Sequence, residues 1–419
     1  MTDQPPKIAD APGLIFKKRK NGYAAYWQAR SDLIAKGYTP QTVPLGPVQG
    51  EISEFERHYI QSTCTRMQDE MLLWGRTEGL PMQAEYDGTL KSLILAYQTD
   101  VDSGFRKKRY RTREHYDYLC RRLIKMHGDQ ELTDLKARVL LRWHEAWSED
   151  GRIAMAHGMI AMLRTVISYG VKFLEEPDEC RRVKEVLSEM RFKVPKPRES
   201  ILTAEQADLI RAKAREMGRP SIALAQAFQF DGTLRQKDVI GEWVPFAEDG
   251  SSEVKTGTMK WLRGIRWSEI DDSLILRHMT SKRDKEVVVN LRLAPMVLDE
   301  LKLAYGLNLA EGLTRSKLPA SGPIIVREVD NLPWGNFEFR RWWRKLANEC
   351  GIPKSVRNMD SRAGAITEAT DAGADLESIR HAATHGDISM TQRYSRGSEK
   401  KTAEVMTLRV AHRNKGGTT

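Results

Sequence analysis

Apolar residues recur at helical spacing through most of residues 88–178, and this pattern predicts several amphipathic helices. Within residues 155–174 they lie three and four positions apart, which is typical of a helix facing a core. Thr89 precedes an apolar segment and is expected to cap its helix. Another helix is expected around Leu119 and Leu123, with a strongly basic polar face. The cations of this face and of the residues just before it are Arg106, Lys107, Lys108, Arg109, Arg111, Arg113, Arg121 and Arg122.

Strand-like patterns occupy only short stretches, so any sheets are expected to be small. Residues 14–30 read LIFKKRKNGYAAYWQAR, in which Asn21-Gly22 predicts a hairpin turn. The cations and aromatic residues of this stretch suit contact with a DNA backbone, and they suit equally a solvated hairpin that closes a small core. Residues 275–291 predict a second hairpin, with its turn at Arg283-Asp284.

These patterns divide the chain into three parts. Its 419 residues are enough for two or three domains of about 150 residues each. Residues 1–80 combine the first hairpin with a long helix over residues 52–79, and residues 88–180 are helical. Residues 198–419 combine helices with the second hairpin. The stretch RFKVPKPRES at residues 191–200 is expected to be an exposed linker. The expected fold class is therefore mainly α with small β-sheets (α+β).

Composition indicates what kind of partner the chain binds and in which compartment it is expected. The chain has 67 basic and 57 acidic residues, a formal net charge of +10 and a pI near 9.3. A field of this sign favours a polyanion, so nucleic acid is the expected partner, although a basic helix face is often only a solvated face. Four cysteines without a CxxC pair indicate reduced thiols in a cytoplasm. No apolar run approaches the roughly 18 residues of a membrane span, and the start of the chain is too polar for a signal peptide. We expect a cytoplasmic protein that does not enter a membrane.

The strongest chemical signal is SVRNMDSRAGAITEATDAGADLESIRHAATHGDISMTQRYSR at residues 355–396. It contains Arg362, His385 and Tyr394 in order, three residue types that can handle a phosphodiester. Arg362 opens a helix-forming segment that is expected to end at Gly373, a glycine suited to a helix C-cap. A second helix is expected to end beside His385. A guanidinium, an imidazole and a phenol can therefore reach one pocket.

These residues resemble the tyrosine recombinase, or phage-type integrase, family. Its second motif runs His-x-x-Arg, a helix, an Ala-Gly-Val/Ala-Asp-like turn, Leu-Gly-His, eight residues and the nucleophilic Tyr. This chain is similar to that motif, without a gap, at Met359-Asp360-Ser361-Arg362, Ala372-Gly373-Ala374-Asp375-Leu376, Ala383-Thr384-His385 and Thr391-Gln392-Arg393-Tyr394.

The family's first motif also has a counterpart. That motif is Thr-Gly-Leu-Arg-x-x-Glu, and it resembles Gly232-Thr233-Leu234-Arg235-Gln236-Lys237-Asp238. Thr233 stands where the family has its glycine. Residues 243–264 form a longer insertion than the family usually has here. We expect that insertion to be a surface loop, with DNA contact as the lesser alternative.

The resemblance implies a set of five catalytic residues. Two guanidinium groups would hold the non-bridging oxygens of the phosphate, and a lysine in the turn of the second hairpin would protonate the leaving 5′ oxygen. A histidine would donate a hydrogen bond to the phosphate, and a tyrosine would attack it. In that order the residues are Arg235, Arg362, Lys282, His385 and Tyr394.

Three positions modify this assignment. Lys285 is a second, less favoured lysine at the same turn. Asp238 stands where the family has a glutamate, and Met359 stands where it has a histidine or sometimes a lysine. A thioether cannot donate a hydrogen bond, so Met359 bears on the rate of any cleavage. The neighbouring Asn358 or Arg357 could partly substitute for the missing donor.

The resemblance implies a site-specific recombinase that integrates or excises a mobile element, such as a prophage, through a 3′-phosphotyrosyl intermediate. It implies a core-binding domain over residues 88–180, a catalytic domain over residues 198–419, and an arm-type DNA-binding region within residues 1–80. Double-stranded DNA, a tetrameric synapse, accessory DNA-bending proteins and nucleoid association follow from the same likeness. The alternatives are an integrase-derived DNA-binding protein that no longer cuts, and a type IB topoisomerase.

No metal, nucleotide or other cofactor is expected. A phosphotyrosyl bond keeps the energy of the phosphodiester, so strand exchange needs neither a metal nor a nucleotide. His381 and His385 are spaced i, i+4, as in a zincin helix. Ala382 occupies the position where the general-base glutamate of such a helix would stand.

Overall fold

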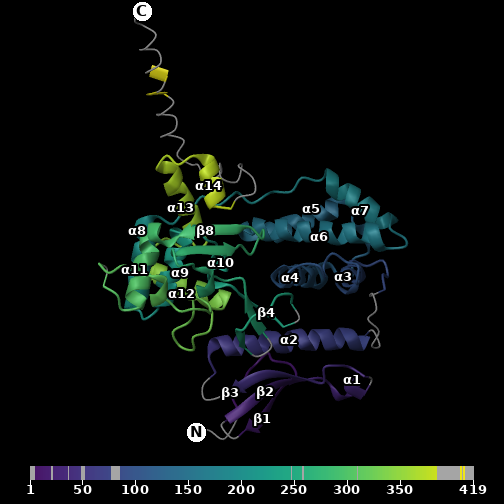
Figure 1. The fold of residues 1–419 in the computed structure, drawn as a ribbon. Coiled ribbons are helices and arrows are strands. Elements are labelled where there is room, and N and C mark those ends of the chain that lie inside the picture. Colours follow the sequence, from purple (N-terminus) through teal and green to yellow (C-terminus); the bar gives the residue numbers. More distant parts are fainter. Residues whose placement is uncertain are drawn as a thin grey trace, which may run out of the picture. The chain divides into compact units, whose positions relative to one another are not determined.

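The structure is a computed structural model of the chain, which divides into two compact units, Met1–Arg198 and Glu199–Thr419. The units are described separately below (Figure 1). The structure describes residues 5–19, 22–35, 37–48, 52–76, 85–246, 248–256, 259–308, 310–384, 406–407 and 409–410.

The first unit begins with a small antiparallel sheet and a long helix. The sheet has the order β1-β2-β3, with β1 over Leu14–Arg19, β2 over Gly22–Gln28 and β3 over Thr42–Val48. The short α1, Ser31–Ala35, lies between β2 and β3 in the chain, and α2 covers Glu54–Arg76. Pairing of Leu14 with Trp27 confirms the first predicted hairpin, whose turn residue Asn21 lies outside the described residues. Burial of Trp27, Cys64 and Met71 gives this part a core of its own.

The rest of the first unit is helical and has a second core. Its helices are α3 (Leu90–Thr99), α4 (Tyr110–His127), α5 (Ala137–Ser148), α6 (Ile153–Phe173) and α7 (Asp178–Glu189). Thr89 Oγ1 accepts a hydrogen bond from Ser92 N at 3.1 Å, which confirms the predicted cap of α3. Leu119 and Leu123 are buried as the spacing predicted. Residues 191–200 carry no helix or strand and are largely exposed, as expected of a linker.

The second unit packs its helices around the buried α9, Pro220–Phe230, in which every residue from Ile222 to Phe230 is buried. Helices α8 (Ala204–Glu216), α10 (Gln236–Ile240), α11 (Pro295–Ala304) and α13 (Asp360–Asp371) contact α9. Helix α12 (Asn336–Glu349) contacts α8, and α14 (Leu376–Ala382) contacts α13. Helices α13 and α14 are drawn in yellow-green and yellow in Figure 1. Strands β7 (Ile275–Met279) and β8 (Glu286–Asn290) form the second predicted hairpin.

The expectation of a surface loop over residues 243–264 is wrong. Strands β4 (Glu242–Pro245), β5 (Lys255–Thr256) and β6 (Met259–Leu262) form a three-stranded sheet of order β4-β6-β5 in this region. Trp243 is 5% exposed and Trp261 is fully buried. Their indole N–H groups donate to the carbonyls of Pro333 and Ile240, at 3.1 and 2.8 Å. The strands are too short for their pattern to stand out from the Gly and Ser residues between them, and burial of the two indoles is what holds the sheet on the unit.

The predicted class, mainly α with small β-sheets, is confirmed. Three small antiparallel sheets accompany the helices in the part of the chain that the structure describes. Within those ranges, no helix combines the length and the apolar character needed to cross a bilayer.

Candidate active site

Arg235 enters the site from the turn between α9 and α10. Thr233 in this turn adopts a positive φ of 49°, and Arg235 then begins α10 as its N-cap residue. The Arg235 side chain is 23% exposed, and its Nη1 lies 3.6 Å from Asp238 Oδ2, one helical turn further along. The same Nη1 is 3.5 Å from Thr384 Oγ1, at the long limit of a hydrogen bond. This second contact joins the first motif to the segment just before His385.

Asp238 connects α10 to the second hairpin. Its side chain is fully buried, and its Oδ1 accepts a hydrogen bond from Ser281 N at 2.7 Å. Ser281 is the first residue of the loop that carries Lys282. A buried carboxylate needs such a donor, since burying an unpaired charge is strongly unfavourable. Asp238 therefore fixes the start of the Lys282 loop relative to the helix that Arg235 begins.

The hairpin separates the two candidate lysines. Met279 pairs with Glu286, and Thr280 N donates to Lys285 O at 2.9 Å, so Lys285 closes the ladder. Lys282 lies within the loop itself, and both lysines are exposed. The backbone of Lys285 is thus held by the strands, whereas Lys282 follows the residue that Asp238 anchors. The choice between them remains a prediction in favour of Lys282.

Arg362 lies on α13 and its side chain reaches the same turn. Its Nη1 donates to Thr233 O at 2.6 Å, and its Nη2 donates to Ala383 O. One guanidinium thus bridges the turn before Arg235 and the end of α14. The two arginines that the motifs singled out are 127 positions apart in number, yet Arg235 contacts Thr384 and Arg362 contacts the adjacent Ala383.

A buried hydrogen-bond chain holds the start of α13. Trp343 Nε1 donates to Gln226 Oε1 at 2.8 Å, and Gln226 Nε2 donates to Ser361 Oγ at 3.1 Å. Ser361 Oγ in turn donates to Asn358 O at 2.8 Å. Gln226 and Ser361 have no exposed surface, so this chain spans α12, α9 and α13 inside the core. It sets the position of the residues that flank Met359.

Met359 and Asn358 differ sharply in exposure. Met359 is 60% exposed and is the N-cap residue of α13 without a side-chain cap, while Asn358 is only 4% exposed. Neither Asn358 Oδ1 nor Nδ2 has a hydrogen-bond partner. Asn358 and Met359 line a cavity of about 490 Å³ together with several cations. The cations that line it are Arg340, Arg341, Arg344, Lys354 and Arg357.

The cations of α12 were missed as candidate site residues. The sequence carries the run RRWWRK within α12, and the structure places Gln236 of α10 against that helix, with Gln236 Nε2 donating to Asn336 Oδ1 at 2.6 Å. Partial burial and the nearby Arg357 cation lower the pKa of Arg344. Cations held this close repel one another, and an anion bound between them would relieve that repulsion.

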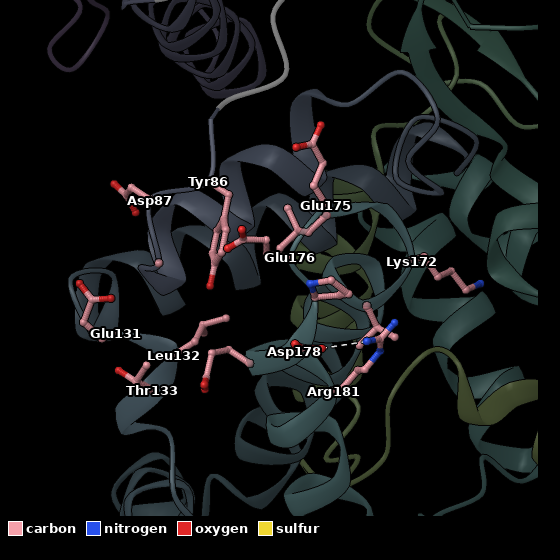
Figure 2. Close-up of a pocket in the computed structure, with 15 residues that line it drawn as sticks. Tyr86, Asp87, Glu131, Leu132, Thr133, Lys172, Glu175, Glu176, Asp178 and Arg181 are labelled. Carbon is pink, nitrogen blue, oxygen red and sulfur yellow. Dashed lines mark hydrogen bonds and ion pairs between the residues drawn. The ribbon is translucent and has the colours of Figure 1, made fainter.

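A larger cavity in the first unit has the opposite charge. It measures about 1020 Å³, and Figure 2 shows Glu131, Glu175 and Glu176 around it. Arg181 Nη1 pairs with Asp178 Oδ1 at 2.8 Å, and Lys172 is the other cation at its edge. Burial and the surrounding carboxylates raise the pKa of Tyr86 to about 12. This cavity repels a polyanion and is not part of the candidate active site.

His385 and Tyr394 lie outside the described residues, so their roles stay predictions. Up to that point the predicted helix ends are confirmed. Helix α13 ends at Asp371, with Gly373 following at φ 85°, and Asp375 caps α14 by accepting from Glu377 N and Ser378 N. Among the described residues, no group of three or more His, Cys, Asp and Glu side chains could hold a metal ion.

Neither a protein-family model nor a curated protein sequence matches this chain. Solved structures do match its fold. A lambda integrase dimer bound to a COC′ core site aligns at a TM-score of 0.54 and 17% identity, covering 94% of this chain and 98% of that one. A lambda integrase tetramer bound to a Holliday junction gives 0.54 and 16%, covering 94% and 97%. The Tn1549 transposon integrase in complex with circular intermediate DNA gives 0.51 and 12%, covering 76% and 99%.

Sequence identities this low do not transfer an activity from one protein to the other. The alignments nevertheless cover most of this chain and nearly all of each integrase chain, so the likeness concerns the fold as a whole. The expectation of an integrase-like fold is confirmed: this chain has the α+β fold of the lambda and Tn1549 integrases.

Proposed function

We propose that this chain is a site-specific DNA recombinase that cuts and rejoins DNA through a 3′-phosphotyrosyl intermediate. The observation that carries the proposal is that Arg235 and Arg362 contact adjacent residues, Thr384 and Ala383, directly before His385 in the chain. Two guanidinium groups in one place suit a phosphodiester, because each can donate two hydrogen bonds to non-bridging oxygens. The DNA-bound integrases that share the fold support the same substrate.

The chemistry needs one nucleophile, one acid and a positive surround. Tyr394 releases its phenolic proton to water and its oxygen attacks phosphorus, the bond from phosphorus to the 5′ oxygen breaks, and the leaving oxygen takes a proton from Lys282. Charge that develops on the non-bridging oxygens is stabilised by Arg235 and Arg362, with a hydrogen bond from His385. A 5′-hydroxyl of another strand reverses the steps, so no metal or nucleotide takes part.

The rest of the proposal concerns the other parts of the chain. The helical region over residues 88–180 would be a core-binding domain that closes on DNA together with the catalytic domain over residues 198–419. The first sheet would contact arm-type DNA, since Lys17 Nζ lies 5.0 Å from the Tyr26 ring centroid and Arg19 Nη2 donates to Tyr26 Oη at 2.8 Å on its outer face. A tetrameric synapse, accessory DNA-bending proteins, nucleoid association in a cytoplasm and integration or excision of a mobile element complete the proposal.

A second candidate function is DNA binding without cleavage. It is favoured by Met359, which is 60% exposed at the position where a histidine donor belongs in the family motif. Nicked suicide substrates built from the flanks of the encoding locus distinguish the two functions. These duplexes lose a short fragment after cleavage and so trap the covalent adduct, which survives denaturing electrophoresis. Adducts support the recombinase, whereas tight binding without adducts supports the second candidate.

Met359→His is expected to leave cleavage unchanged or to accelerate it. Loss of one preorganised donor typically costs about 3 kcal/mol, or about a hundredfold in rate, so we expect the wild-type chain to cut slowly. Single-turnover adduct formation measures the effect, and Met126→His, a 40% exposed methionine on α4, is the matched control. If Met359→His cuts and the wild type does not, the binding-only function gains; if neither cuts, the recombinase proposal fails.

DNA binding is expected to weaken steeply with salt, because phosphate contacts release condensed counterions. Six or more contacts would lower the affinity by about a thousandfold between 50 and 200 mM salt. Arg340→Gln removes an exposed cation of the basic cavity and should reduce the slope of log K against log salt by about 1. Lys172→Gln, at the acidic cavity, is the control and should leave the slope unchanged. An affinity that is flat over this range contradicts a clamp on the DNA backbone.

A further inference from the structure

Two threonines of the second unit adopt a backbone conformation that β-branched residues rarely take. Thr233 has φ 49° and Thr384 has φ 48°, both in the left-handed region. Both stand where the motifs in the related family carry a glycine, the residue that tolerates this conformation without steric penalty. A β-branched side chain retained under such strain needs a compensating interaction.

Each threonine contacts the segment that contains the other. Thr233 Oγ1 donates to Ala382 O at 3.3 Å, and Arg235 Nη1 donates to Thr384 Oγ1 at 3.5 Å. Thr384 is 6% exposed, so its hydroxyl faces the protein rather than solvent. Glycine at either position would remove the corresponding contact while keeping the chain path.

The same two segments are also joined by Arg362, through Thr233 O and Ala383 O. That bridge uses N–H groups that a phosphate would compete for. The threonine hydroxyls draw on no Arg362 donor, so their contacts can persist while Arg362 holds a phosphate. Thr384 Oγ1 also contacts Arg235 directly, because it accepts a hydrogen bond from Arg235 Nη1, whose other close partner, Asp238 Oδ2, is an ion-pair partner at 3.6 Å.

We propose that Thr233 and Thr384 are positioning residues that hold the Arg235 turn against the end of α14. The pair, here the threonine clasp, orients the Arg235 guanidinium and fixes the backbone from which the chain enters His385. This inference rests on the proposed recombinase function for its effect on rate. Its structural part, the link between residues 232–235 and 382–384, stands apart from any activity.

Valine variants test the clasp because valine keeps the β-branched shape and loses the hydroxyl. In Thr233→Val and Thr384→Val, hydrogen exchange of the backbone amides at positions 383 and 384 should accelerate about fivefold or more, since the end of α14 opens more often. Adduct formation should slow about tenfold while the DNA dissociation constant stays within about twofold, because a small misplacement of Arg235 impairs chemistry more than binding. Thr233→Ser and Thr384→Ser should restore both readouts.

The double variant sharpens the test. If the two hydroxyls act as one clasp, their effects are not additive. The variant that combines Thr233→Val with Thr384→Val should then lose little more cleavage rate and amide protection than the more impaired single variant. Thr384→Gly removes strain together with the hydroxyl and provides a folded alternative should the valine lower the melting temperature; it too should cut slowly.

Unchanged amide exchange in both valine variants overturns the clasp, whatever the activity. Faster exchange with wild-type cleavage rates overturns its role in positioning Arg235. Absence of adducts from the wild type contradicts the recombinase proposal instead, and the exchange measurements still decide whether the clasp exists.

Discussion

Tyr394→Phe is expected to abolish covalent protein–DNA adducts while leaving the affinity for DNA within about twofold. Only one oxygen is lost, and that oxygen forms the proposed bond to phosphorus. A free phenol has a pKa of about 10, so it attacks efficiently only where cations or a proton acceptor assist it. Arg235, Arg362 and Lys282 would supply that environment. The measurement is adduct formation on suicide substrates, with binding followed in parallel by a gel-shift titration.

Tyr305→Phe is the matched control for this experiment. Tyr305 belongs to the same unit and is 37% exposed, and its ring centroid lies 5.9 Å from that of Trp267. Burial raises the pKa of its phenol, which makes it a poor nucleophile. This variant should form adducts like the wild type. Adducts that persist in Tyr394→Phe would place the nucleophile elsewhere.

Gly364→Ala is expected to destabilise the second unit severely. A Cβ at this position on α13 would lie 1.7 Å from Leu202 O and 2.8 Å from the Leu202 carbonyl carbon. Both atoms are backbone, so no side-chain rotation relieves the overlap. Separating the segments would also break the hydrogen bond from Leu202 N to Asp360 O, now 3.2 Å long. Overpacking of this kind costs about 3 kcal/mol, or about 10 °C in Tm for a unit of this size.

The same substitution should slow cleavage, because α13 also carries Arg362. Gly312→Ala is the control: this glycine has no atom within 4 Å of an added Cβ and an ordinary φ. Its effect should stay within about 0.5 kcal/mol. Thermal unfolding and single-turnover cleavage measure both variants. A wild-type Tm for Gly364→Ala would contradict the close approach of residue 202 to α13.

Local signals in the sequence predicted most of the helices and two of the three sheets. Thr89, Gly373 and the alternation around residues 275–291 act over a few residues, so their consequences can be derived from neighbours alone. The sheet over residues 242–262 could not be derived in this way. Its stability comes from Trp243 and Trp261, whose partners Pro333 and Ile240 are set by the tertiary fold.

For the candidate site too, the sequence predicted the residue types but not the contacts between them. The residue types of Arg235, Asp238 and Arg362 pointed to phosphate chemistry, but their contacts join segments far apart in sequence. Neither the bridge from Arg362 to Thr233 O nor the bond from Ser281 N to Asp238 could be inferred from spacing. The basic cavity beside α12 was missed because a run of cations alone does not distinguish a solvated face from a binding face. His385 and Tyr394 remain predictions from their place in the motif.

The acidic cavity in the first unit has a consequence for how that region approaches a polyanion. Asp87 precedes α3 and borders the cavity, whereas Arg106 follows α3 and donates to Thr99 O at 2.8 Å at its far end. The ten residues of α3 separate the two ends by about 15 Å. Carboxylates at one end and the cations that precede α4 at the other give the helical region an electric dipole. In the field of a polyanion a dipole experiences a torque, so this region would be turned with its basic end forward before contact.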